Sequence, residues 1–445
     1  MRHRKLVGAL LALSLILAGC ASSDDDDASG TGAGTDADAS EADASGEADG
    51  GEAADAADET EELIRSAGDG VPDPDFDYAG LDYNVPVQQS ALRGDRLHPS
   101  FPPPVVEPTL IRSGGQPPDG IFPIDKPTFA PFAEIDYDIA DNEAVIAVDV
   151  DGDARAFPVQ LMIWHEIVNT EIGGVPVTVT YCPLCNSALS FDRRFEDYLL
   201  DFGTSGELYQ SALVMYDRQT DTLWSHFTGT GLVGHLAGAE LTIIPTQTVS
   251  YGDWKAANPD GQVLTRDLSA PPQYQNLYGS NPYAGYDFEG LDPFGQFFVG
   301  EIDRTLLAKA RIVGIADDDT PKAVRFDDLA NTPVIPVTVG GEDAVVLFKP
   351  GLASALDDPS IAEGRDVGQS GVFRPVAADG TALTFTADGD GFVDGETGSM
   401  WNVLGQATDG PRVGERLQSV AHIDTFWFAW AAYQPGTEII RPDGA

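Results

Sequence analysis

Cysteine and lysine are scarce in this 445-residue chain. With only three cysteines, a fold held by several disulfides and a zinc site built from four cysteines of one chain are both excluded. Lys and Arg together number 25 against 72 Asp and Glu, which gives a net charge of −47. So negative a protein repels phosphates, and we therefore expect no nucleic-acid partner.

The acidic surplus also suits high salt, because charge repulsion is screened beyond roughly 3 Å at 1 M salt. Few lysines and many aspartates favour a halophilic protein. An acidic, soluble extracytoplasmic protein is the plainer interpretation, and the charge fits both.

The N-terminus has the pattern of an export signal. A basic segment at residues 2–5 precedes an apolar stretch at 6–17, which is too short for a comfortable membrane span. Leu-Ala-Gly-Cys at 17–20 resembles a lipobox. We interpret residues 1–20 as a lipoprotein signal peptide and Cys20 as the lipidated residue, which predicts an extracytoplasmic protein anchored to the cell membrane. An ordinary secretory signal or an uncleaved anchor is the alternative.

The next hundred residues lack the composition of a folded domain. Residues 21–70 contain no aromatic residue and are mostly small or acidic, so they predict a disordered acidic spacer. Residues 71–120 are rich in proline and predict an extended arm along the folded body.

From residue 121 the chain aligns with itself. The aligned pairs include Gly173-Gly174 with Gly340-Gly341, Ser187-Ala188-Leu189 with Ser354-Ala355-Leu356, Asp217 with Asp394, and Trp224 with Trp401. Alternating runs and glycine-rich turns predict a mainly β fold with some α, built as two similar halves packed together. We expect a front repeat at 121–270, an insert at 271–305 and a degenerate second repeat at 306–445.

The two remaining cysteines form one CxxC motif, Cys182-Pro-Leu-Cys185. It follows an alternating run at 175–181, which predicts a half-buried strand. His165 lies shortly upstream and Glu166 beside it. The back half aligns other residues with these positions: Lys349 with Cys182, Leu352 with Cys185 and Thr332 with His165. We therefore expect the chemistry in the front half alone.

Three interpretations of the motif stay open. In a thiol-disulfide oxidoreductase, Cys182 attacks, Cys185 resolves, and His165 activates the first thiol, with an unknown redox protein as partner. In a metal-binding module, Cys182, Cys185 and His165 hold copper or zinc delivered by a donor protein. In the third, the pair is an inert structural disulfide. His226, beside Trp224, is a second-rank candidate.

Several motifs together resemble domain-of-unknown-function family 3179 over about residues 121–440. They are His165-Glu-Ile-Val-Asn169, Thr180-Tyr-Cys-Pro-Leu-Cys-Asn-Ser-Ala188, Leu213-Val-Met-Tyr-Asp-Arg218 and Phe426-Trp-Phe-Ala-Trp430. The family brings no established activity. Relatives with selenocysteine in the CxxC position imply thiol or selenol redox chemistry at Cys182 or Cys185. The resemblance supplies no substrate.

Overall fold

The computed structural model describes three stretches of the chain: residues 85–266, 270–317 and 319–442. The predicted signal peptide with Cys20, the acidic spacer and the first part of the arm lie outside these residues. No helix within the three stretches has the length and apolar character needed to cross a membrane.

Strands dominate the described residues, and the helices between them are short. The prediction of a mainly β protein with some α is confirmed. The α-helices are α3 (Val159–His165), α4 (Tyr251–Ala257), α5 (Pro272–Gln275), α6 (Phe326–Asn331) and α7 (Trp427–Tyr433). The 3-10 helices are η2 (Val87–Gln89), η3 (Pro108–Leu110), η4 (Phe132–Glu134) and η5 (Ile361–Glu363).

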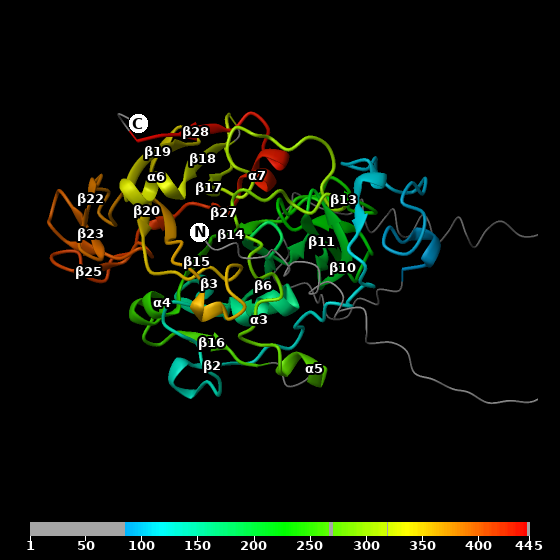
Figure 1. Cartoon of the computed structure of the whole chain (residues 1–445), viewed down its shortest axis with the longest axis horizontal. Coiled ribbons are helices and arrows are strands. Elements are labelled where there is room, and N and C mark those ends of the chain that lie inside the picture. The colour runs from blue at the N-terminus through cyan, green and yellow to red at the C-terminus, as the bar shows by residue number, and fades with distance from the viewer. Residues whose placement is uncertain (1–84, 267–269, 318, 443–445) are drawn as a thin grey trace, which may run out of the picture. The chain divides into compact units, whose positions relative to one another are not determined.

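The front half contains sheets F1, F2 and F3, drawn from cyan to green in Figure 1. Sheet F1 contains, in spatial order, β15 (Thr246–Ser250), β3 (Ala144–Val150), β4 (Asp153–Pro158), β16 (Gln262–Leu264) and β2 (Phe129–Pro131). Sheet F2 contains β14 (Ile243–Ile244), β7 (Ser187–Asp192), β6 (Val175–Cys182) and β5 (Ile167–Ile172). Sheet F3 contains β1 (Arg112–Ser113), β10 (Phe202–Tyr209), β11 (Ala212–Asp217), β12 (Leu223–Ser225) and β13 (Gly231–Val233). A separate ribbon pairs β8 (Arg194–Phe195) with β9 (Tyr198–Leu199).

The back half contains sheets B1, B2 and B3. Sheet B1 contains β27 (Ile423–Phe426), β17 (Arg311–Ile315), β18 (Lys322–Arg325) and β28 (Glu438–Ile440). Sheet B2 contains β19 (Val334–Val339), β20 (Glu342–Lys349), β21 (Gln369–Arg374) and β26 (Gln418–Ser419). Sheet B3 contains β22 (Phe385–Asp388), β23 (Gly391–Asp394), β24 (Met400–Trp401) and β25 (Ala407–Asp409).

The same strand pairings occur in both halves. In F1, β3 pairs antiparallel with β4 and β15, and β4 pairs parallel with β16. In B1, β17 pairs antiparallel with β18 and β27, and β18 pairs parallel with β28. The strand orders of F2 and F3 likewise recur in B2 and B3, apart from the added β1. An ancestral duplication stays a prediction, and these pairings agree with it.

Paired glycines set the register of two matching hairpins. Gly173 and Gly174 join β5 to β6 with φ of 57° and 80°, and Gly340 and Gly341 join β19 to β20 with φ of 61° and 75°. A two-residue hairpin turn with both φ values positive matches the twist of its strands, and glycine adopts it without strain. The glycine pairs aligned in the sequence therefore occupy equivalent turns.

The halves differ at the turn that carries the cysteines. Four residues, 183–186, join β6 to β7, whereas residues 350–368 join β20 to β21. Cys182 pairs with Ser187, and Lys349 pairs with Gln369. Gln369, not Ser354, is thus the positional counterpart of Ser187. The sequence alignment is wrong at this point because the longer loop shifts the register.

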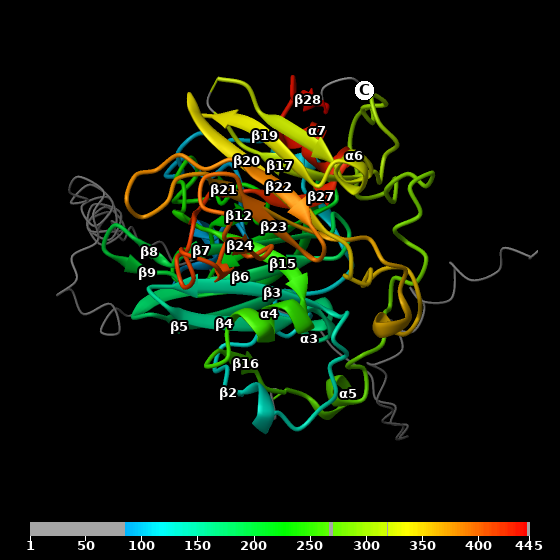
Figure 2. The same cartoon turned by 90° about the vertical axis from the view of Figure 1, so that its left-hand side faces the viewer.

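The main core contains side chains from both halves. Cys182 and Cys185 from the front half lie in the same buried cluster as Phe426 and Trp430 from the back half. In Figures 1 and 2, β17, β19 and β20 lie above β3 and α4 in both views. The CxxC turn is therefore enclosed by both halves.

Candidate functional site

The CxxC motif forms the turn of the β6–β7 hairpin. Cys182 ends β6, and its partner across the hairpin is Ser187, the first residue of β7. Pro183 fixes the backbone at the first turn position. Asn186 adopts φ of 52°, in the left-handed region that asparagine tolerates better than most residues. The turn therefore places Cys182 and Cys185 together at the end of the hairpin.

Both thiols are free and buried. The exposed fraction is 1% for Cys182 and 0% for Cys185. The Sγ of Cys182 lies 3.9 Å from the carbonyl oxygen of Ser211, in the β10–β11 turn. The Sγ of Cys185 lies 3.8 Å from the carbonyl oxygen of Cys182 and 3.0 Å from the Oγ of Ser187. The pair is a reduced dithiol whose two sulfurs have different neighbours.

The surroundings make the two thiols unequal acids. Burial alone raises the pKa of Cys182, but the Cys185 thiol and the backbone N–H groups of Cys185, Leu213 and Leu184 donate hydrogen bonds that outweigh burial and lower it. Burial raises the pKa of Cys185 well above its usual range, the neighbouring Cys182 adds to this effect, and the contact with Ser187 offsets only a part of it. Cys182 is therefore the thiol that ionises more readily.

A chain of buried side chains continues from Cys185. Ser187 Oγ lies 2.8 Å from Nε2 of His226, and Nδ1 of His226 lies 2.6 Å from Oγ1 of Thr180. Thr180 Oγ1 in turn donates a 3.0 Å hydrogen bond to the carbonyl oxygen of Leu189. Burial lowers the pKa of His226 to about 3, so its imidazole is neutral near pH 7.

Tyrosines surround the two thiols. The Tyr286 hydroxyl donates a 3.0 Å hydrogen bond to the carbonyl oxygen of Leu184, inside the CxxC turn. Burial first, and then the neighbouring cysteines, raises the pKa of Tyr286, Tyr181 and Tyr433. These side chains are therefore neutral and supply no charge to the dithiol.

Residues of the predicted insert cover the turn from one side. Besides the Tyr286 bond, the N–H of Ser211 donates to the carbonyl oxygen of Phe297 at 2.9 Å. The N–H of Val299 donates to Oε1 of Gln210 at 3.1 Å. The covering segment, residues 276–309, thus contacts both the CxxC turn and the β10–β11 turn.

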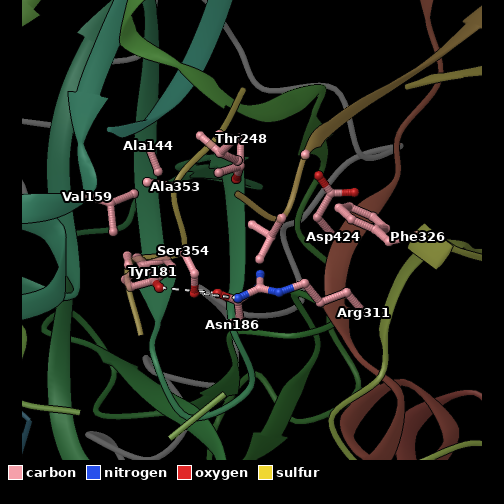
Figure 3. Close-up of a pocket in the computed structure, with 14 residues that line it drawn as sticks. Ala144, Val159, Tyr181, Asn186, Thr248, Arg311, Phe326, Ala353, Ser354 and Asp424 are labelled. Carbon is pink, nitrogen blue, oxygen red and sulfur yellow. Dashed lines mark hydrogen bonds between the residues drawn. The ribbon is translucent and has the colours of Figure 1, made fainter. Parts of the chain in front are cut away.

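A small cavity of about 30 Å³ reaches the cysteine turn from the back half (Figure 3). Tyr181 and Asn186, which flank the motif, form part of its wall, and Arg311, Ser354 and Asp424 face them. Arg311 Nη2 donates a 2.8 Å hydrogen bond to Ser354 Oγ. The lining residues include neither cysteine, so the cavity ends beside the turn and does not open onto the sulfurs.

The family model described as protein of unknown function (DUF3179) matches residues 118–437. The chain belongs to the DUF3179 family. The resemblance drawn from the motifs is thereby confirmed. Searches of curated proteins and of solved structures found no match.

In this DUF3179 protein, His165 and the cysteines have different partners. His165 ends α3 and is fully buried. Its Nδ1 lies 2.6 Å from the carbonyl oxygen of Phe122, and its Nε2 lies 2.7 Å from the Tyr278 hydroxyl. Both ring nitrogens thus bind groups other than the thiols. The role of His165 as activating base stays a prediction, and these bonds do not favour it.

Glu166 is the side chain that this segment brings toward Cys182. Burial, and then the charge of Cys182, raises the pKa of Glu166 well above its usual range, which favours the protonated carboxyl group. Its φ of 60° is unusual for a residue other than glycine, and such backbone strain is common at functional sites. The carbonyl oxygen of Glu166 accepts a 2.8 Å hydrogen bond from the N–H of Tyr181, which ties it to the cysteine strand.

For copper or zinc, the turn supplies two sulfur ligands, Cys182 and Cys185. Among the described residues, no group of three or more His, Cys, Asp and Glu side chains lies where it could hold a metal ion. Zinc sites in proteins almost always use three or four protein ligands. Metal binding by Cys182, Cys185 and His165 stays a prediction, and the described side chains do not complete such a site.

The sequence interpretation missed Thr180 and Ser187 as members of this site. A signal for both existed, because residues two apart on a strand face the same side, and Thr180 and Cys182 are two apart. Ser187 follows Cys185 by two residues and opens the returning strand. The contact of His226 with both hydroxyls depends on how sheet F3 packs on F2, and no local pattern predicts it.

Proposed function

We propose that the protein is an extracytoplasmic, lipid-anchored thiol-disulfide oxidoreductase whose redox couple is Cys182 and Cys185. The observation that carries the proposal is the inequality of two adjacent thiols in one turn. Hydrogen bonds lower the pKa of Cys182, while burial raises that of Cys185. A pair of titratable groups whose environments separate their pKa values is a common mark of divided catalytic roles.

The chemistry follows from that division. The Cys182 thiolate attacks one sulfur of a substrate disulfide, R–S–S–R′, so that a Cys182–S–S–R bond forms and R′–S⁻ leaves to take a proton from solvent. Cys185 then attacks the Cys182 sulfur. The Cys182–Cys185 disulfide forms, and R–S⁻ leaves and takes up the proton that Cys185 releases. Two electrons pass from the dithiol to the substrate, and the reverse sequence oxidises a substrate dithiol.

Burial of both sulfurs sets a condition on this chemistry. With exposed fractions of 1% and 0%, neither thiol meets a substrate disulfide unless the structure opens. The covering segment, residues 276–309, has no regular secondary structure and contacts the turn through single hydrogen bonds such as that of Tyr286. Displacement of this segment would expose Cys182 to a substrate.

The anchoring part of the proposal comes from the N-terminal sequence. The basic segment, the short apolar stretch and Cys20 fit a lipoprotein signal. A lipid on Cys20 followed by the acidic spacer places the redox site outside the cytoplasm, where disulfide exchange has substrates.

A redox titration tests the proposal. The full chain is equilibrated in glutathione buffers of graded potential, and the Cys182–Cys185 disulfide is quantified by mass spectrometry. We expect a reduction potential between about −300 and −120 mV, the range of exchange-active pairs. A bridge that stays oxidised below about −300 mV would identify an inert structural disulfide.

A metal titration tests the remaining alternative, a metal-binding module. The reduced chain is titrated with Cu(I) and with Zn²⁺ under competition from a chelator. The redox proposal predicts no tight uptake. Stoichiometric uptake that is lost in both Cys182→Ala and Cys185→Ala would instead support a metal-binding module.

A further inference from the structure

Four buried side chains form one continuous hydrogen-bonded chain: Cys185, Ser187, His226 and Thr180. The exposed fractions of Ser187, His226 and Thr180 are 1%, 0% and 0%. Bulk solvent therefore does not reach these groups. The chain ends on the carbonyl oxygen of Leu189, which can only accept.

The distances leave the donors within this chain open, and the carbonyl end favours one direction for them. Thr180 has one hydroxyl proton, and it goes to Leu189, so Oγ1 of Thr180 accepts from Nδ1–H of His226. Nε2 of the neutral imidazole then has no proton and accepts from the Ser187 hydroxyl. The Ser187 oxygen has given its proton away, so it faces Cys185 Sγ as an acceptor. In this arrangement Ser187 offers no proton to Cys185, so Cys185 keeps its own S–H, which faces Ser187 or, when Cys182 ionises, Cys182.

We propose that His226, acting through Ser187, is a positioning residue that holds the proton on Cys185 and thereby leaves Cys182 as the attacking thiol. The inference rests on the proposed redox function for its purpose. The placement of the proton itself is testable without any redox reaction.

Ser187 can hold the proton on Cys185 because a hydrogen bond favours one protonation state of the thiol. An acceptor facing a thiol stabilises the neutral form and disfavours the thiolate. If the His226 proton moved from Nδ1 to Nε2, the ring would donate to Ser187, and the Ser187 hydroxyl would turn to the Cys185 sulfur. Ser187 would then stabilise the thiolate. The tautomer of His226 therefore decides which form of Cys185 its neighbours favour.

The other groups around Cys185 do not compete with this effect. Its titratable neighbours are Cys182, on the same turn, and the three tyrosines described above. Glu166 acts on Cys182, and burial raises its pKa, which favours the uncharged carboxyl group. Two charged groups act on these tyrosines: Arg311 acts on Tyr181 and is paired with Asp287 at 2.9 Å, and Lys309 Nζ lies 3.3 Å from the centre of the Tyr286 ring.

Thr180→Val is expected to reverse the direction of the hydrogen bonds from His226 to Cys185, with little change in side-chain shape. Valine removes the acceptor of Nδ1–H, so the imidazole proton is expected to move to Nε2. The matched control is Thr178→Val, two residues earlier on the same strand. Thr178 is fully buried, and its Oγ1 has no hydrogen-bond partner among the described residues. Both variants make the same change, and only one of them touches the His226 chain.

The first readout is the relative labelling of the two thiols. The full chain is alkylated to a low extent near neutral pH, and peptide mass spectrometry assigns the label. Both cysteines share the same burial, so their ratio cancels the rate of opening. We expect the Cys182-to-Cys185 ratio to fall by about tenfold in Thr180→Val, which corresponds to about one pKa unit, and to stay unchanged in Thr178→Val. An unchanged ratio in Thr180→Val overturns the inference.

A double-mutant cycle separates the hydrogen-bond chain from general loosening. In a Ser187→Ala background the link between His226 and Cys185 is absent, so adding Thr180→Val is expected to leave the ratio unchanged. The same tenfold fall in both backgrounds would show an effect that bypasses Ser187 and would overturn the inference.

A spectroscopic readout needs no variant. In the reduced wild-type chain, ¹⁵N NMR of labelled histidines identifies the protonated ring nitrogen of His226. We expect Nδ1–H, and observation of Nε2–H contradicts the inference even if Thr180→Val fails to fold. A protein that shows the expected tautomer and labelling ratio but forms no reversible disulfide would refute the redox proposal alone.

Discussion

The indole Nε1 of Trp224 donates a 2.8 Å hydrogen bond to Oδ2 of Asp217. In the back half, Nε1 of Trp401 donates a 2.9 Å bond to Oδ2 of Asp394. The two pairs are aligned in sequence, and β11–β12 and β23–β24 carry them in matching positions. Their electrostatics nevertheless differ. Burial raises the pKa of Asp217 to about 6, whereas at Asp394 hydrogen bonds, led by that of Trp401, outweigh burial and lower the pKa.

The Asp217 shift predicts a pH-dependent stability. The folded protein binds this proton more tightly than the unfolded chain, whose pKa is near 3.8. The free energy of unfolding should therefore fall as pH rises from about 4 to about 6, by about 3 kcal/mol for a shift of two pKa units, and be constant above. Urea unfolding of wild type and Asp217→Asn across this range isolates the contribution, because the variant lacks the fall.

Asp394→Asn is the matched control for Asp217→Asn. A lowered pKa contributes stability above the unfolded value that is lost as pH falls. Asp394→Asn should therefore change the pH dependence of the free energy of unfolding in the sense opposite to Asp217→Asn. Equal slopes in both variants would contradict the different environments of the two carboxyl groups.

Much of the framework follows from such local patterns. The glycine turns, the Asp–Trp pairs and the strand before Cys182 are visible in the sequence because each depends on residues close together in the chain. The counterpart of Ser187 was predicted wrongly because Ser354-Ala355-Leu356 matches Ser187-Ala188-Leu189 in sequence but lies within the longer loop, residues 350–368. The contact between His226 and Ser187 joins segments 39 residues apart, and only the packing of two sheets creates it.

Thr178→Val should stabilise the protein. Its buried hydroxyl has no hydrogen-bond partner within the described residues, and burying such a group costs about 1–3 kcal/mol. Valine has a similar shape and no hydroxyl, so we expect the free energy of unfolding to rise by about 1 kcal/mol in urea titrations. Thr180→Val should instead lower it, because Nδ1 of the buried His226 is left without a hydrogen-bond partner. A loss of stability in Thr178→Val would show a role for its hydroxyl.

Tyr286→Phe should loosen the covering segment without changing the balance between the thiols. The variant removes the bond to the Leu184 carbonyl, worth about 1 kcal/mol, so both cysteines should be alkylated several-fold faster at an unchanged ratio. Phe288→Leu is the control, since Phe288 lies in the same segment and its exposed fraction is 64%. Equal labelling rates in wild type and Tyr286→Phe would argue against opening at this point.

High salt should stabilise the chain. With 72 acids against 25 bases, repulsion between carboxylates opposes folding, and it weakens as the Debye length falls from roughly 10 Å at 0.1 M to roughly 3 Å at 1 M. We expect Tm to rise by several degrees over that range of KCl. An uncharged osmolyte serves as the control, and a Tm that falls in KCl would contradict the role of charge repulsion.

Trapping of a mixed disulfide tests the central claim most directly. Alanine fits these buried apolar sites better than serine, so Cys185→Ala and Cys182→Ala are each incubated with oxidised glutathione. The account predicts that Cys185→Ala accumulates a glutathione adduct on Cys182 at least about tenfold faster than Cys182→Ala accumulates one on Cys185, because the backbone N–H donors to Cys182 remain in Cys185→Ala. Equal rates, or no adduct on Cys182, would contradict a redox couple led by Cys182.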